Sequence, residues 1–148
     1  MTHLNNLFIF LLIIMLTLTA GLAQAHQSSS DAYEYYKRGL TYHDKANYYG
    51  AIFEFTKAIQ ADPAYAKAFY NRGIVYTNLG RYNEAISDFT KAIQIDPTDA
   101  LSYYNRGITY FLKKKYNKAW NDINEAIKIG VQIHPVFLQH LREDSGRE

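Results

Sequence analysis

The chain has 148 residues, enough for one domain of ordinary size and too few for two large ones. Its 16 Lys and Arg residues nearly balance 14 Asp and Glu residues, and the resulting net charge of +2 excludes a strongly basic nucleic-acid-binding module. Cysteine is absent, which excludes disulfides, thiolate catalysis and cysteine-ligated zinc. With 14 Tyr, 8 Phe and only 3 Pro, the composition predicts a compact helical domain.

Residues 1–25 have the composition of a secretory signal peptide. They contain no Asp, Glu, Lys or Arg, and the apolar run over residues 7–22 is 16 residues long, shorter than the roughly 20 residues that span a bilayer. Small residues at Ala23 and Ala25 match a cleavage site, so we expect cleavage after Ala25 and an exported protein, periplasmic or secreted. The alternative is an uncleaved N-terminal membrane anchor, because Lys and Arg are missing before the apolar run.

Three segments of equal length follow, and they align without a gap over residues 32–65, 66–99 and 100–133. The first two are identical at nearly half of their positions, which chance does not produce. Small residues recur in register in all three segments: Gly39, Gly73 and Gly107, Ala51, Ala85 and Ala119, then Ala58, Ala92 and Ala126. The repeat is therefore the unit from which the fold is built.

Each segment predicts two amphipathic helices. In the second segment, Phe69, Gly73 and Tyr76 are spaced by four and three residues and share one helix face. Gly80 ends that helix, and the face of the next includes Phe89. Small residues on the facing sides let the two backbones approach closely, and an Asp-Pro pair ends the second helix.

This pattern resembles the tetratricopeptide repeat, whose period is the same as the length of these segments. The first two segments supply its aromatic, glycine, tyrosine, alanine and proline positions: Tyr35, Gly39, Tyr42, Ala51, Phe55, Ala58 and Pro63, then Phe69, Gly73, Tyr76, Ala85, Phe89, Ala92 and Pro97. The third departs at Ile123, where Phe is usual, and at Val131, where Pro is usual. The resemblance implies an all-α fold, a right-handed helix-turn-helix solenoid of three repeats.

We expect the solenoid to end in a capping helix over residues 134–144. His134-Pro135 opens it, and Phe137, Leu138 and Leu141 lie on one side. Trp120 replaces the isoleucines of the earlier repeats and is expected to pack beneath this helix. Residues 26–31 and 145–148 are expected to be loose.

No catalytic constellation is found, and no enzyme, cofactor or metal is expected. His43, His134 and His140 are isolated, and the chain has no metalloprotease motif, nucleophile elbow or phosphate loop. After cleavage, His26 would be the new N-terminus and could chelate a metal with its amine. No second ligand is near it in sequence, so we interpret this as coincidence.

Two charged columns repeat with the period. Arg38, Arg72 and Arg106 occupy a place where the family usually has leucine, and the second helices carry Glu54, Asp88 and Asp122 in register. One interpretation is an arginine ladder that holds an acidic ligand. The interpretation we favour is a structural arginine–carboxylate pair, because a partly buried arginine needs a partner and each repeat supplies one.

The functional prediction comes from the groove that first helices line in this family, where a peptide segment of a partner protein binds. By resemblance, Tyr36, Tyr70 and Tyr104 form an aromatic ladder along it, Asn71 and Asn105 bond the ligand backbone, and Lys37 lies at its border. The apolar side chains expected to face it are Leu40, Ile74, Ile108, Phe111 and Leu112, with Thr77 beside them. The alternative is that the tyrosines only pack between stacked repeats.

A charged clamp for a C-terminal carboxylate occurs in chaperone-binding members of the family. It needs Lys and Asn in the first repeat and Lys and Arg in the third, where this chain has Tyr36, Leu40, Leu101 and Asn105. Only Asn71 matches, so binding of chaperone tails is not expected.

The sequence leaves two further functions open. Lys113, Lys114, Lys115 and Lys118 give the third repeat a charge of +4; they form either a solvated turn or a binding site for an anionic envelope surface. The aromatic repeats could also serve as a structural module that self-assembles into a homo-oligomer. The expected partner is a protein or peptide, not nucleic acid, and a membrane only if residues 1–25 are retained.

Overall fold

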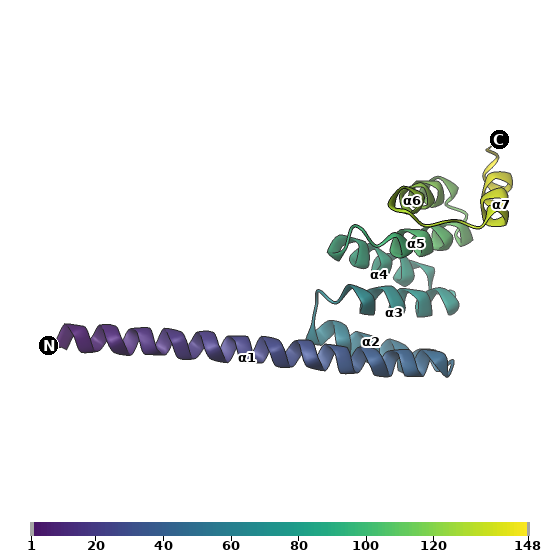
Figure 1. Cartoon of the computed structure of the whole chain (residues 1–148). Coiled ribbons are helices and arrows are strands. Elements are labelled where there is room, and N and C mark those ends of the chain that lie inside the picture. The colour runs from purple at the N-terminus through teal and green to yellow at the C-terminus, as the bar shows by residue number, and fades with distance from the viewer. Residues whose placement is uncertain (1, 148) are drawn as a thin grey trace.

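The computed structural model describes residues 2–147, which form helices joined by short turns (Figure 1). Two helices make each repeat, and the repeats stack side by side, so the predicted all-α solenoid is confirmed. The helices are α1 (Thr2–Asp44), α2 (Tyr48–Ala61), α3 (Ala66–Asn78), α4 (Tyr82–Ile95), α5 (Ala100–Leu112), α6 (Tyr116–Ile129) and α7 (Pro135–Ser145).

The first helix, α1, is 43 residues long and projects far beyond the stack (Figure 1). Its C-terminal part pairs with α2 as the first helix of repeat one. Within the described chain it is the one helix long and apolar enough to cross a membrane, although an N-terminal signal sequence has the same properties. Residues 26–31 continue this helix where the sequence predicted a loose segment, because no Pro or Gly interrupts them and Gln27 donates to Asp31 four residues later (2.9 Å).

The core of each repeat depends on one close contact between its two helices. Gly39 of α1 faces Phe55 of α2, and a Cβ atom at position 39 would lie 2.5 Å from the phenyl ring. Gly73 has the same relation to Phe89, at 2.8 Å. Both phenylalanines are fully buried, so a side chain at either glycine would force the helices apart.

The last helix, α7, covers the end of the stack as predicted. His134 caps its N-terminus, and Leu141 is fully buried against the third repeat. Leu141 lies one repeat length after Gly107, so it occupies the glycine column; no further helix follows within the described residues to crowd it. Trp120 packs in the same cluster and donates to Ser145 (3.1 Å), which confirms its predicted place.

The turns within the repeats place one residue each in the left-handed backbone region. These residues are Ala46, Gly80 and Lys114, with φ of 55°, 71° and 57°, and they lie in register, one repeat length apart. Glycine adopts this conformation freely, whereas a residue with a Cβ atom incurs a steric cost. The turn of the second repeat, which has glycine at this position, is therefore less strained than the turns of the first and third repeats.

We predict that Gly80→Ala lowers the free energy of unfolding by about 1–2 kcal/mol through backbone strain alone, because no atom lies within 4 Å of the place its Cβ would take. Urea denaturation measures this loss. Asn78→Ala, an exposed helical change two residues away, is the matched control and should have little effect. An equal loss in both variants would contradict the backbone explanation.

Candidate functional site

The first helices of the repeats line a cavity of about 430 Å³. Tyr36 of α1 and Leu101 of α5 flank it, and α3 supplies Ala66, Lys67, Tyr70 and Asn71. Asp96 and Asp99, in the turn that leads into α5, complete its lining. The cavity therefore spans three repeats at the N-terminal ends of α3 and α5.

A hydrogen-bonded ladder links the tyrosines of the cavity to the following repeat. The Asn71 amide donates to the Tyr36 hydroxyl (3.2 Å) and to the Lys67 carbonyl (2.9 Å). Asn105 repeats the arrangement with the Tyr70 hydroxyl (3.1 Å) and the Leu101 carbonyl (2.9 Å). The side chains predicted to bond a ligand backbone thus already donate their amide hydrogens within the chain, and the amide oxygens are the groups left for a ligand.

The tyrosine hydroxyls stay protonated in this setting. Burial raises the pKa of Tyr36 and of Tyr70, the amides of Asn71 and Asn105 lower it in part, and the charge of Asp99 raises that of Tyr70 further. Each hydroxyl accepts a hydrogen bond from its asparagine and gives its own hydrogen to no acceptor among the described residues. Tyr36 and Tyr70 can therefore each donate to a bound ligand.

Several residues predicted to line the groove lie elsewhere. Tyr104 and Phe111 pack edge-on against Phe137 of the capping helix, at 6.2 and 5.5 Å between ring centres. Leu40 packs against the core of the first repeat. The cavity is also not lined by Ile74, Ile108, Leu112 or Thr77. Ile74 and Ile108 are partly buried, Leu112 is half-exposed, and Thr77 donates to the Gly73 carbonyl. Lys37 pairs with Glu34 (3.2 Å). The structure thus gathers Tyr36, Tyr70 and Asn71, and α7 covers the end of the aromatic ladder.

The two carboxylates of the cavity were not predicted. Asp99 caps the N-terminus of α5 and accepts from the Leu101 amide (3.1 Å), while Asp96 accepts from the Thr98 amide (3.0 Å). Both aspartates lie in the turn around Pro97, and the sequence pattern there predicted only the end of a helix. The stacking of the repeats brings this turn beside Tyr70.

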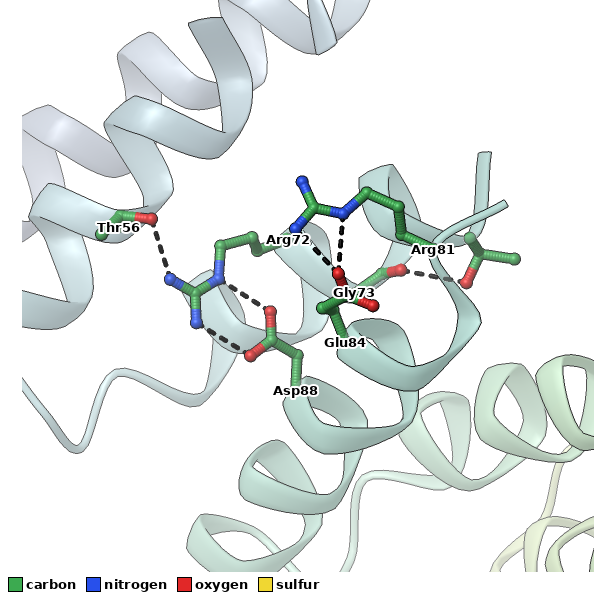
Figure 2. A network of polar contacts seen from close by, with 7 residues as sticks. Thr56, Arg72, Gly73, Arg81, Glu84 and Asp88 are labelled. Atoms are coloured by element: carbon green, nitrogen blue, oxygen red, sulfur yellow. Dashed lines mark hydrogen bonds and ion pairs between the residues drawn. The ribbon is translucent and has the colours of Figure 1, made fainter. Parts of the chain in front are cut away.

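The arginine column forms the structural pairs that the sequence predicted (Figure 2). Arg72 of α3 makes two bonds to the Asp88 carboxylate of α4, at 2.7 and 2.8 Å, and a third to the Thr56 hydroxyl of the preceding repeat at 2.8 Å. Arg106 repeats this network in the next repeat with Asp122 and Thr90. The guanidinium groups thus tie two helices of one repeat to the repeat before it.

The first repeat has only part of this network. Arg38 makes one bond to Glu54 (2.8 Å), and its side chain is 50% exposed against 15% for Arg72. No repeat precedes it among the described residues, so no threonine reaches its outer face. Arg72 and Arg106 thus use their donors in structural contacts, as the favoured interpretation expects, and Arg38 does so only in part.

The lysine cluster lies away from the cavity. Lys114, Lys115 and Lys118 surround a second hollow of about 350 Å³ beside Tyr116 and Ser145. Lys113 donates to Asn83, and the Lys118 ammonium lies 5.5 Å from the centre of the Tyr110 ring. No carboxylate of the described chain pairs with these lysines, so they form an open basic surface at the turn of the third repeat.

Comparison with known families agrees with this geometry. Models of the tetratricopeptide repeat match residues 66–99 and 89–121, and a TPR repeat model matches residues 39–80. A solved structure of this family, the second TPR of Spaghetti (RPAP3) bound to HSP90 peptide SRMEEVD, is 30% identical, with a TM-score of 0.69 over 72% of this chain and 97% of that one. The chain belongs to the tetratricopeptide repeat family.

Other tetratricopeptide structures superpose as well. The Arabidopsis OM64 TPR domain is 24% identical, with a TM-score of 0.75 over 78% of this chain and 98% of that one. The second TPR domain of human RPAP3, in complex with HSP70 peptide SGPTIEEVD, is 25% identical, with a TM-score of 0.69 over 82% and 98%. Among curated protein sequences no match is found.

The Arg72–Asp88 pair leads to a prediction about pH. Burial raises the pKa of Asp88, and the hydrogen bonds and charge of Arg72 lower it in part. In Arg72→Ala burial and the nearby charge of Glu84 remain, so the pKa of Asp88 rises further, and at neutral pH an unpaired carboxylate costs about 3–5 kcal/mol. Because the folded pKa then lies above the unfolded one, this penalty grows as the pH rises between the two values and shrinks in acid.

Urea unfolding of Arg72→Ala near pH 5 and near pH 7.5 tests this expectation. The matched control is Arg81→Ala, which removes the exposed Arg81–Glu84 pair shown in the same view (Figure 2) and should change stability little at either pH. A stable Arg72→Ala protein that no longer binds its ligand would instead assign the arginine to the binding site.

Proposed function

We propose that the chain is a non-catalytic interaction module that binds a peptide segment of a partner protein in the cavity beside Tyr36 and Tyr70. The observation that carries the proposal is the combination found there: two aromatic rings, two hydroxyl hydrogens without an acceptor in the described chain and the amide oxygen of Asn71. An extended peptide offers alternating carbonyl and amide groups that fit such donors and acceptors, and aromatic anchors supply much of the energy in such interfaces.

The solved relatives support this function. The RPAP3 domains that superpose on the chain are described in complex with HSP90 and HSP70 peptides. The chain differs from a carboxylate-binding clamp, because Tyr36, Leu40 and Leu101 stand where basic or amide side chains are needed. We therefore propose a peptide ligand other than the acidic chaperone tail.

The groove hypothesis predicts that Tyr70→Ala weakens binding of the partner peptide by at least about thirtyfold, which corresponds to about 2 kcal/mol for a central aromatic anchor. Tyr70→Phe keeps the ring and should retain most of the affinity, while it leaves Asn105 without one acceptor. Isothermal titration measures both, with a peptide from a partner captured by crosslinking the mature protein in its own envelope fraction.

Tyr49→Ala is the matched control, because Tyr49 is 74% exposed and does not line the cavity. A thermal melt of each variant separates loss of binding from loss of fold. Binding through the lysine cluster would behave oppositely: it would survive Tyr70→Ala, fall steeply with salt and vanish when Lys114, Lys115 and Lys118 become Gln. Self-assembly would appear as a concentration-dependent dimer in sedimentation.

We also propose that the module works outside the cytoplasm after removal of residues 1–25. The short apolar run and the small residues before His26 motivate this proposal. Intact mass spectrometry of the protein from its own cells should give a species that begins at His26. A membrane-bound species that retains Met1 would favour the anchor.

A further inference from the structure

We propose that the cavity selects a peptide segment with a lysine or arginine side chain, which it holds over the Tyr70 ring and against the carboxylates of Asp96 and Asp99. This inference rests on the proposed function and names the chemistry of the ligand. It reverses the charge preference expected of a clamp for acidic tails.

The two carboxylates are fixed in place by hydrogen bonds. Asp99 is held by the Leu101 amide and the Ser102 hydroxyl, and Asp96 by the amide and hydroxyl of Thr98 (3.0 and 2.7 Å). The Thr98 bonds lower the pKa of Asp96. Neither aspartate forms an ion pair with a described residue, so both negative charges are available to a ligand.

The aromatic ring beside them suits a cation. Tyr70 packs on Phe89 at 6.0 Å between ring centres and also lines the cavity. The field of Asp99 reaches this tyrosine, because it contributes to the raised pKa of the Tyr70 hydroxyl. A carboxylate next to an aromatic face is the arrangement that binds ammonium and guanidinium groups.

The corresponding place one repeat earlier is closed. The residue one repeat length before Asp99 is Tyr65, and its ring packs edge-on against Tyr36 at 5.2 Å between centres. Among the described residues, two aspartates therefore line a cavity beside a tyrosine of the ladder at the step between the second and third repeats, whereas the step before it has one aspartate, Asp62, at the corresponding positions. This difference between two otherwise similar repeats points to a specific side chain of the ligand.

The basic groups of the cavity do not cancel its acidity. Lys67 is the one cation that lines it among the described residues, against two aspartates. The positions that supply lysine and arginine to a carboxylate clamp in the third repeat carry Leu101 and Asn105. An acidic peptide would meet net negative charge here, and a basic one would meet its complement.

Three pools of short, end-blocked peptides test this inference on the full-length chain in a mild detergent. The pools share random flanking residues and carry Lys, Gln or Glu at the centre. We expect the Lys pool to bind about fivefold more tightly than the Gln pool, as one screened ion pair with an aromatic contact provides, and the Glu pool to bind most weakly. Higher salt should reduce the difference.

Two variants of opposite sign separate charge from fold. Asp96→Asn with Asp99→Asn keeps an acceptor oxygen for the Thr98 amide and for the Leu101 amide at the N-cap of α5, where asparagine serves as well as aspartate, and should abolish the preference for Lys. A thermal melt checks the fold of this variant, because the Ser102 hydroxyl loses its acceptor. Lys67→Gln removes the exposed cation and should increase that preference. A preference for Lys that persists in the double Asn variant would overturn the inference.

The outcomes also distinguish the inference from the proposed function. Equal binding of all three pools that is lost in Tyr70→Ala would overturn the charge preference and leave the groove function standing. If no pool binds, or if binding is unaffected by Tyr70→Ala, both are wrong.

Discussion

The bidentate contact between Arg72 and Asp88 sets the geometry on which the cavity depends. It joins α3 to α4 within one repeat, and its third bond, to Thr56, reaches the repeat before. A buried ion pair adds little net stability, because desolvation offsets most of the attraction. Its contribution is instead orientation: a planar guanidinium with three fixed acceptors permits one rotation of neighbouring repeats. That rotation places Tyr36 within reach of Asn71.

The two ends of the stack show what happens where this constraint is missing. Arg38 has no threonine before it and remains half-exposed. At the other end, α7 has Leu141 in the glycine column, because no second helix follows within residues 2–147 to pack on it. The first repeat thus keeps its arginine with fewer partners, and α7 carries a large apolar residue where the repeats have glycine, as a helix that covers a solenoid end requires.

The sequence predicted the parts of this structure that depend on period. The register of the repeats gave the helix pairs, the glycine–aromatic contacts, the arginine–carboxylate pairs and the packing of Trp120 under the cap. It did not predict that the asparagine amides already donate within the chain, because the tyrosine that accepts from each asparagine is 35 residues away in the sequence. It also missed Asp96 and Asp99, whose side chains explain a turn locally and line the cavity only after the repeats stack.

The fate of the apolar N-terminal segment does not affect the cavity. All side chains of residues 11–24 are exposed, so none contributes to the packing of a repeat. Among the residues of α1 whose burial the structure describes, the first that is buried in the stack is Ala32, seven positions after the expected cleavage site. Removal of residues 1–25 would shorten α1 and leave every contact of Tyr36, Asn71 and Tyr70 in place. A retained segment would tether the same cavity to a membrane through a continuous helix. The proposed ligand recognition rests on the stacked repeats and the proposed location rests on residues outside them, so each proposal can fail without the other.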